Sequence, residues 1–278
     1  MASGDPSTAF VEAACVPLDA SHGEGSLDEA EAIRAAHPQL AAQAIYLAAI
    51  LGDAAAVAAA LAAEPGAATA AAGPRGWNPL THLCFSRYLR LDPGRSAGFV
   101  RAATALLDAG ADPNTGFDSP QHQPKPAFES VLYGAAGVAH HAGVTAVLLA
   151  RGADPNDDET PYHAPEGFDD AAMRLVVESG RLDHSGLTTM LHRKLDWDHR
   201  AGAAWLLEHG ADPNDVSLWG DRALHHALAR DNPPAMIALL LTHGADPTLP
   251  APRWNGLSAV ELARHRGRTD ALTLFGAT

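Results

Sequence analysis

The chain has few cysteines, no long apolar run and none of the common catalytic motifs. Its two cysteines, Cys15 and Cys84, lie far apart and form no Cys-x-x-Cys pair, which argues against a disulfide framework or a cysteine zinc site. The N-terminus lacks a basic stretch followed by an apolar run, and no window holds about 18 uncharged apolar residues. We therefore expect a cytoplasmic protein without a signal peptide or a membrane span.

Positive charge is also scarce. Lysine and arginine total 19 against 33 aspartates and glutamates, which gives a net charge of -14, and Lys125 and Lys194 are the only lysines. A protein that binds the phosphate backbone needs a basic patch, so nucleic acid is excluded as the expected partner. The acidic excess favours solubility, or alternatively attracts cationic partners.

Motifs for covalent catalysis and for cofactors are missing as well. The stretch Gly-Arg-Ser-Ala-Gly at 94–98 has the Gly-x-Ser-x-Gly spacing, but no strand is expected before it, as a nucleophile elbow requires. There is no Walker-type phosphate loop, Gly-x-Gly-x-x-Gly turn or His-Glu-x-x-His pair. We expect no cofactor and no metal. The content of 47% hydrophobic and 19% charged residues is that of an ordinary packed protein.

One short pattern recurs four times along the chain. Each copy has two leucines, two variable residues and then Gly-Ala-Asp-Pro, which is typical of an apolar helix end, a glycine with positive φ and a turn. A degraded fifth copy, "LVVESGRLDH", contains Gly180. Spacings of about 28 to 42 residues between the glycines predict stacked helical repeats. The four copies are "LLDAGADPN" at 106–114, "LLARGADPND" at 148–157, "LLEHGADPND" at 206–215 and "LLTHGADPT" at 240–248.

A second pattern lies about twenty residues before three of the glycine turns and about thirty residues before Gly110. It reads "NPLT" at 78–81, "TPYH" at 160–163, "TMLH" at 189–192 and "RALH" at 222–225. Together the two patterns resemble the ankyrin repeat family, in which a Thr-Pro-Leu-His tetrapeptide opens the inner helix of each repeat. The resemblance implies a threonine and a histidine that fix the turn, and an all-α solenoid of about eight stacked helix-turn-helix units.

Divergent copies extend the resemblance over residues 1–278, which we expect to form one ankyrin-repeat domain. Residues 9–38 are expected to be an N-terminal capping pair, 43–249 the repeats and 256–278 a capping C-terminal repeat. Two stretches, 86–98 and 114–128, lengthen loops. Such insertions are either tolerated surface variation or part of the binding side.

The resemblance also indicates a binding face, because ankyrin-repeat proteins commonly bind other proteins through exposed residues of the concave side. The expected function is a protein-binding scaffold, and its acidic face predicts a cytoplasmic partner with a basic segment. The candidate binding residues are Trp77, Phe85, Glu129, Glu159, Phe168, Arg193, Trp197, Asp221 and Arg230.

An alternative hypothesis places a small-molecule or acid/base catalytic site, of cyclase or isomerase type, in the middle of the groove. Small residues there predict a depression, unless they only permit tight helix packing. His82, His226 and Asp196 are the candidates for proton transfer, and His122, His140 and His141 also lack an assigned structural role. The small residues are Gly134, Gly137, Ala164 and Gly167.

Overall fold

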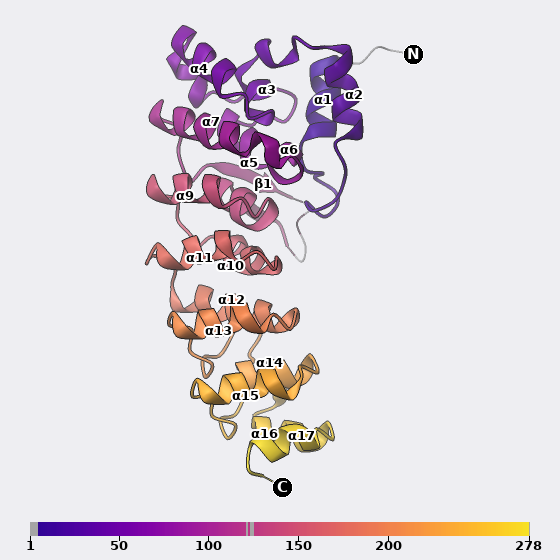
Figure 1. Cartoon of the computed structure of the whole chain (residues 1–278), viewed down its shortest axis with the longest axis vertical. Coiled ribbons are helices and arrows are strands. Elements are labelled where there is room, and N and C mark those ends of the chain that lie inside the picture. The colour runs from indigo at the N-terminus through magenta and orange to yellow at the C-terminus, as the bar shows by residue number, and fades with distance from the viewer. Residues whose placement is uncertain (1–4, 121, 123–124, 278) are drawn as a thin grey trace. The chain divides into compact units, whose positions relative to one another are not determined.

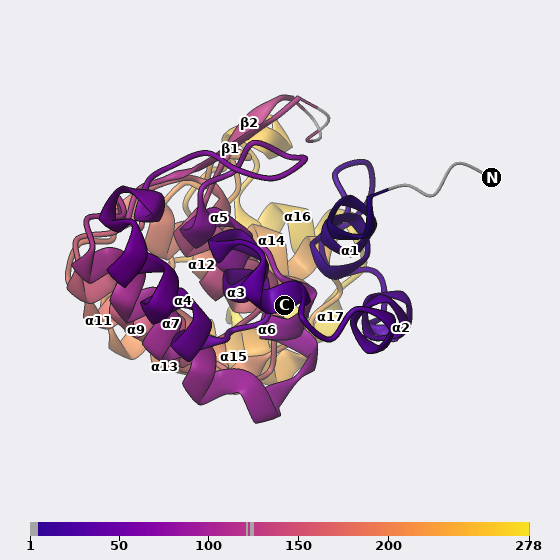
Figure 2. The same ribbon diagram turned by 90° about the horizontal axis from the view of Figure 1, so that it is seen from above.

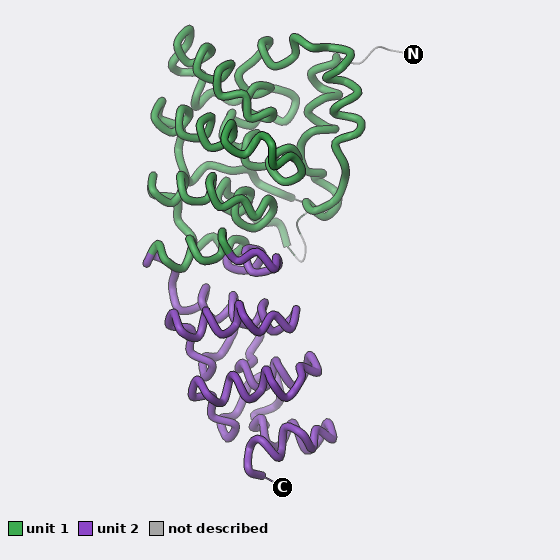
Figure 3. Tube along the Cα trace, viewed as in Figure 1, with its two compact units in different colours: residues 1–160, 171–179 green, residues 161–170, 180–278 purple. Residues whose placement is uncertain are grey.

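The computed structural model describes residues 5–120, 122 and 125–277, and it divides into two compact units (Figure 3). Unit 1 comprises residues 1–160 and 171–179, and unit 2 comprises residues 161–170 and 180–278. Each unit is built from pairs of short antiparallel helices. This confirms the predicted all-α ankyrin-type architecture.

In unit 1 the first helices of successive pairs pack on one another, and so do the second helices. We call the first helix of each pair the inner helix and the second the outer helix. Thus α3, α5 and α8 form the inner layer, whereas α4, α7, α9 and α11 form the outer layer (Figure 1). The repeat helices of unit 1 are α3 (Ile45–Ile50), α4 (Ala54–Ala63), α5 (Pro79–Cys84), α7 (Ser96–Asp108), α8 (Val131–Tyr133) with a π-helical turn (Gly134–Val138), α9 (Ala142–Ala150) and α11 (Ala171–Glu178).

Unit 2 repeats this arrangement. Its inner helices α12, α14 and α16 contact one another in sequence, and its outer helices α13, α15 and α17 do the same. Helix α10 (Glu159–His163) contains residues of both units, and the 3-10 turn Ala164–Glu166 packs on α12. The other helices of unit 2 are α12 (His184–Asp196), α13 (Arg200–Glu208), α14 (Ala223–Ala229), α15 (Pro234–Thr242), the 3-10 turn Pro252–Trp254, α16 (Ala259–His265) and α17 (Thr269–Leu274).

The recurring Gly-Ala-Asp-Pro pattern forms the turn after each outer helix. Gly210 has a φ of 101°, which a residue with a Cβ rarely adopts, and Asp212 accepts a hydrogen bond from the amide of Asn214 at 2.8 Å. The Asn214 side chain then donates to the carbonyl of Gly244 and accepts from the amide of Asp246, both at 2.8 Å. Asn114 makes the same two contacts with Gly152 and Asp154, so in these two copies the motif ties its turn to the turn of a later copy.

Both predicted insertions have defined structure. Residues 86–98 form α6 (Arg87–Leu91) and the 3-10 turn Pro93–Arg95 before α7 begins. Residues 114–128 contribute to an antiparallel hairpin of β1 (Gly116–Ser119) and β2 (Ala127–Ser130), in which Phe117 pairs with Glu129. The ankyrin-type turn is therefore extended here into a two-stranded sheet.

The N-terminal helix pair exists but differs from the expected cap. Helices α1 (Pro6–Ala14) and α2 (Asp28–Ala36) contact each other, and the 3-10 turn Leu40–Ala42 leads into α3. Figure 2 shows α1 and α2 on the side of α3 and α5, opposite the outer helices α4, α7 and α9. The pair therefore runs along the inner layer of unit 1. A capping pair would instead lie at the end of the stack and continue it. Another 3-10 turn, Pro65–Ala68, follows α4.

Among the described helices, none combines the length and the apolar character that a membrane-spanning segment requires.

Candidate functional site

The predicted binding residues of unit 1 lie inside an aromatic cluster. Phe85, at the end of α5, is 0% exposed, and Trp77, in the turn before α5, is 7% exposed. The Trp77 ring stacks on Phe117 of β1 with centroids 4.4 Å apart, and Phe85 meets Phe117 edge to face at 4.9 Å. Aromatic contacts of this kind stabilise a core. The expectation that Trp77 and Phe85 are exposed is wrong.

The N-terminal segment supplies much of this burial. The amide of Val16 donates to the carbonyl of Phe85 at 3.0 Å, and Arg75 forms an ion pair with Glu12 at 2.7 Å. The hydroxyl of Tyr88, in α6, donates to Glu31 of α2 at 2.6 Å. These contacts link both N-terminal helices to the insertion at 86–98 and to the inner layer. The chain therefore covers part of its own predicted binding face.

Glu129 is the acidic residue at the centre of this covered region. Its side chain is 1% exposed, and its carboxylate lies 3.3 Å from Nδ1 of His22, in the loop between α1 and α2. The hydroxyl of Tyr133 lies 3.3 Å from the same nitrogen. Glu159 is also largely covered, with 12% exposure and a contact of 3.2 Å to Nε2 of His122. Neither glutamate forms the exposed acidic surface that we expected.

His82 is unsuited to the predicted proton transfer. It is fully buried in α5, with its ring between those of Tyr46 at 5.2 Å and Trp77 at 5.3 Å. Burial lowers the pKa of His82 to about 4, although its Nε2 lies 3.3 Å from the carbonyl of Ala72. The imidazole is therefore neutral near pH 7 and packs as an aromatic ring.

Two other histidines without a predicted role also serve the fold. His141 accepts a hydrogen bond from the amide of Val144 and so caps α9, while its Nε2 lies 2.8 Å from the Ser96 hydroxyl. Nδ1 of His122 lies 2.9 Å from the carbonyl of Lys125. His140 has a φ of 49° in the turn before α9.

In unit 2 the predicted residues form a connected ionic network. Arg193 of α12 lies over the Tyr162 ring, 4.1 Å from its centroid, and donates to the Tyr162 carbonyl at 3.2 Å. The same guanidinium pairs with Glu166 at 2.5 Å and with Asp196. Arg193 is 8% exposed. Its guanidinium group therefore stabilises the packing of the inner layer and presents little charge to solvent.

His226 of α14 lies between two carboxylates. Its Nε2 is 2.7 Å from Asp196, and its Nδ1 is 3.2 Å from Asp221. Burial alone would lower the pKa of His226, but hydrogen bonds to Asp196 and Asp221 outweigh it and raise that pKa. Burial opposes ionisation of Asp196, yet His226, Arg193 and Arg230 lower the pKa of its carboxyl. The predicted pair of His226 and Asp196 is thus in direct contact.

Asp221 anchors the other end of this network. Its side chain is 1% exposed and accepts a hydrogen bond from Nε1 of Trp254 at 3.0 Å and from Arg253 at 3.2 Å. Burial would raise the pKa of Asp221, but His226 and Arg253 together lower it. The carboxylate is therefore ionised and internally paired, so its expected exposure to a partner is wrong.

Several side chains at the inner helices and turns of unit 2 reach solvent. Trp197, which ends α12, is 50% exposed, and Trp219, in the turn before α14, is 37% exposed. Arg230, which ends α14, is 52% exposed while its Nε lies 2.6 Å from Asp196. The side chain of Arg253 is 50% exposed. We call Trp197, Trp219, Arg230 and Arg253, together with the Asp196–His226–Asp221 network, the inner face of unit 2.

Phe168 is the most exposed of the predicted binding residues, at 72%. Its ring meets His199 edge to face at 5.0 Å. Nearby, Lys194 is fully buried, and its ammonium group donates to Asp170 at 2.6 Å and to the carbonyl of Gly167 at 2.8 Å. The loop that carries Phe168 is thereby held on α12.

The residues of the predicted depression are divided between the two units. Gly134 and Gly137 belong to unit 1, and Ala164 and Gly167 to unit 2. A Cβ at Gly134 would come 2.9 Å from the carbonyl oxygen of Cys84, closer than real contacts allow. Tight packing against α5 therefore explains Gly134. The depression itself stays a prediction.

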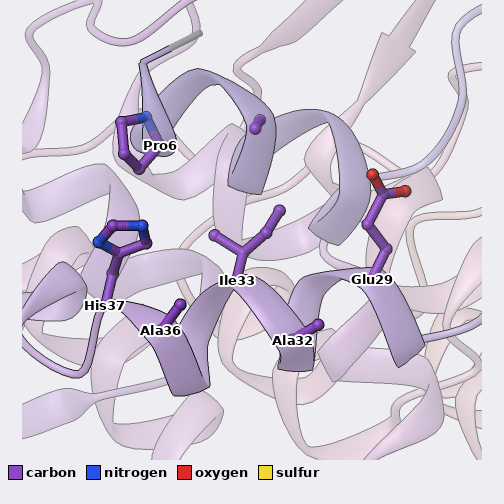
Figure 4. A pocket seen from close by; sticks show the side chains of 7 residues that line it. Pro6, Glu29, Ala32, Ile33, Ala36 and His37 are labelled. Atoms are coloured by element: carbon purple, nitrogen blue, oxygen red, sulfur yellow. The ribbon is translucent and has the colours of Figure 1, made fainter. Parts of the chain in front are cut away.

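A small hollow of about 370 Å³ lies between α1 and α2 (Figure 4). Figure 4 shows Ile33 pointing towards α1, with Glu29 and His37 at opposite ends of the hollow. Ala32 and Ala36 line its middle with methyl groups. Since the ionisable groups stand only at the ends, the hollow offers apolar contact and no paired acid and base.

Sequence reasoning did not find four residues of these sites. His22 and Phe117 complete the cluster of unit 1, and Trp219 and Arg253 complete the inner face of unit 2. The last two lie in the turns before α14 and α16 and are not among the candidate binding residues given by the sequence. The presence of an aromatic residue, Trp219, and a basic residue, Arg253, in these two turns could have indicated a binding surface. No signal marked His22.

The comparisons with known proteins agree with this architecture. Residues 191–241, within unit 2, match the family model for ankyrin repeats. A search of the curated proteins finds no match. The human ASB11 ankyrin repeat domain has a TM-score of 0.58 and 22% identity, and the alignment covers 78% of this chain and 90% of that one. The ankyrin repeat domain of Bcl-3, a member of the IkappaB protein family, has a TM-score of 0.53 and 23% identity over 66% of this chain and 82% of its own.

Residues 191–241 thus match the ankyrin-repeat family model, and the stacked helix pairs have the fold of ankyrin repeat domains. Domains of this class generally act as scaffolds for protein interactions.

Proposed function

We propose that the chain is a cytoplasmic protein-binding scaffold whose docking surface is the inner face of unit 2. The observation that carries this proposal is the exposure of two tryptophans and two arginines at the inner helices and turns of unit 2, with Trp197 at 50% and Trp219 at 37%. Trp219, Arg230 and Arg253 contact the ionic network. Tryptophan and arginine are the residues that most often dominate binding energy at protein interfaces. The free, buried thiols of Cys15 and Cys84 agree with a reducing compartment.

The charges favour a partner segment that carries carboxylates. Asp221 and Asp196 are 1% and 10% exposed, whereas the side chains of Arg230 and Arg253 are 52% and 50% exposed. The arginine side chains are therefore exposed to solvent, whereas Asp196 and Asp221, the carboxylates that pair with them, are buried. This replaces the basic segment expected from the sequence with an acidic segment that contains apolar side chains. Complementary charge would speed association and fix the orientation of the partner.

The contact between His226 and Asp196 gives no support to an acid/base enzyme. Each ring nitrogen of His226 already faces a carboxylate, at 2.7 Å and 3.2 Å. A general base must present a nitrogen within hydrogen-bond reach of the substrate proton. The network accordingly positions Arg230 and Arg253 on the inner face.

The proposal can be tested by selecting displayed random peptides against the full chain and then measuring their affinities for variants. We expect the selected peptides to be enriched in aspartate and glutamate beside apolar residues. Their affinity should fall about tenfold or more in Trp197→Ala, and by a similar factor in Arg230→Ala.

Helix α13 offers matched controls on the outer layer. Trp205→Ala and Arg200→Ala remove the same residue types and should leave peptide affinity within about twofold of the wild type. Selection of basic peptides, or binding that survives the inner-face changes and is lost in Trp205→Ala, would contradict the proposed surface.

A further inference from the structure

The covered cluster of unit 1 has the form of a pocket with one occupant. The rings of Phe85, Phe117 and Tyr133 surround the imidazole of His22, with centroid distances of 6.0, 6.4 and 6.0 Å. The carboxylate of Glu129 lies 3.3 Å from Nδ1 of the same ring. His22 is 10% exposed and Glu129 1% exposed, so the imidazole fills the pocket and shields the carboxylate.

The segment that delivers His22 is a loop on the surface of unit 1. Residues 17–27 contain no helix or strand, and within this loop all side chains but Pro17, His22 and Leu27 are exposed. By contrast, α1 before the loop buries Phe10 and Val11 completely. We call residues 17–27 the strap. It connects α1, which buries four of its residues, to α2, in which Ala30 is the buried residue.

The strap has few anchors. His22 is one, and the close passage of Gly25 beside the Arg87 guanidinium, where a Cβ would come within 2.6 Å, is another. A further hydrogen bond, from the amide of Glu24 to the carbonyl of Ser21, lies within the strap itself. An exposed segment with few buried contacts opens locally at a small fraction of the global unfolding free energy. The strap can therefore lift while α1, whose Phe10 and Val11 are fully buried, stays in place.

The chemistry of the pocket selects a cation. Aromatic rings present their negative π faces to a positive group, and a buried carboxylate needs a positive or hydrogen-bonding partner to offset its desolvation. An aliphatic side chain would satisfy the rings but bring no positive charge to Glu129. A protonated imidazole, ammonium or guanidinium group satisfies both.

We propose that Phe85, Phe117, Tyr133 and Glu129 form a cation-binding pocket that His22 occupies as an internal ligand, and that lifting of the strap opens it to a basic side chain of a partner protein. This site is independent of the acidic segment proposed for unit 2. The pocket of unit 1 would then bind a basic group of a partner, and the inner face of unit 2 an acidic segment.

The test uses the full chain with His22→Ala, which empties the pocket. n-Butylammonium reproduces the end of a lysine side chain, and n-butanol has the same length without the charge. We expect n-butylammonium to raise the melting temperature of His22→Ala by about 2–4 °C in a saturable manner. It should have no such effect on the wild type, whose pocket is full, or on His22→Ala/Glu129→Gln.

Equal stabilisation by n-butanol would overturn the proposal, because the pocket would then be only an apolar hole. So would the absence of any effect of n-butylammonium on a folded His22→Ala protein. The selected acidic peptides should bind His22→Ala with the same affinity as the wild type. The cation pocket of unit 1 and the docking surface of unit 2 are therefore tested independently.

A second pair of variants needs no added ligand and covers the case in which His22→Ala does not fold. His22→Lys should melt close to the wild type, because the ammonium group can reach Glu129, whereas His22→Leu should melt several degrees lower. A leucine variant at least as stable as the lysine variant would contradict a cation site. In the wild type, amides of residues 17–27 should exchange hydrogen well before those of α1 and α5; simultaneous exchange would contradict a strap that lifts on its own.

Discussion

The two units present their inner layers to solvent in different ways. In unit 1 the aromatic side chains Trp77 and Phe85 are 7% and 0% exposed, because β1 and the N-terminal segment pack over them. In unit 2 the aromatic side chains Trp197 and Trp219 are 50% and 37% exposed above an ionic network. The same repeat architecture therefore yields a covered surface in one unit and an open surface in the other.

This difference shows that a repeat position does not determine exposure. Phe85 and Trp197 both follow the last residue of an inner helix, after α5 and α12 respectively. Only Phe85 receives a backbone hydrogen bond from the N-terminal segment, through the amide of Val16. Function at a given repeat position thus depends on what the rest of the chain places over it.

The largest expected effect comes from truncating matched aromatic residues of the two units. Phe85→Ala should reduce the free energy of unfolding by about 3–5 kcal/mol, because it leaves a cavity in a closed aromatic cluster. Trp197→Ala should cost less than about 1 kcal/mol, since half of that side chain is already in water. Chemical denaturation measures both values. Similar losses from the two changes would remove the proposed distinction between covered and open surfaces.

Acidification should destabilise the protein through one buried histidine in each unit. Burial lowers the folded-state pKa of His82 and of His192 to about 4, below the usual 6.5. Between these values the unfolded chain binds the proton and the folded chain does not, so stability falls as the pH drops from about 6.5 to about 4. Each site contributes up to about 3 kcal/mol.

Denaturation at several pH values in His82→Gln and His192→Gln tests this. Each change should remove its own share of the acid loss, and the double variant should have a much flatter profile over that range. A wild-type stability that is constant from pH 7 to pH 4 would show that neither imidazole resists protonation.

A smaller effect is expected at the two exposed arginines of unit 2. Arg230→Ala and Arg253→Ala should each weaken binding of an acidic peptide by about tenfold, or roughly 1.4 kcal/mol, and reduce the salt dependence of its association rate. Arg101, on the outer helix α7 of unit 1, offers a control in which binding stays unchanged. Equal loss of affinity in Arg101→Ala would indicate a nonspecific effect of net charge.

The smallest predicted effect concerns His226. Contacts with Asp196 and Asp221 outweigh burial and raise its folded-state pKa above 6.5, so its ion pairs stabilise the protein fully below pH 6.5 and less as the pH rises through the folded-state value. His226→Gln should therefore cost more stability at pH 6 than at pH 9. A cost that grows with pH would mean that the imidazole is neutral between the two carboxylates.

Much of the fold could be predicted from the sequence because its signals are local. Glycines such as Gly210 adopt the positive φ that the turn pattern requires, and Asn78 caps α5 by accepting a hydrogen bond from the amide of Thr81 at 2.9 Å. The tetrapeptide histidine His225 reaches the next repeat, with Nε2 2.9 Å from the carbonyl of Leu257. Such features depend on residues within one or two repeats.

The sites were predicted less well because they depend on distant contacts. Glu129 and His22 are more than one hundred residues apart in the sequence, and no local sequence pattern around either residue indicates their contact. The contact between Asp196 and His226 and the burial of Asp221 follow from the packing of α12 and α14. A list of repeat positions cannot show which carboxylates are already paired.

The most direct test of the difference between the units is fluorine NMR of the full chain labelled with 5-fluorotryptophan. The sequence contains five tryptophans, so single Trp→Phe variants can assign every resonance. On titration with a selected acidic peptide, we predict shifts at Trp197 and Trp219 and unchanged resonances at Trp77 and Trp205. A shift at Trp77 with Trp197 and Trp219 unaffected would contradict the account, because the partner would then bind the unit that the chain covers.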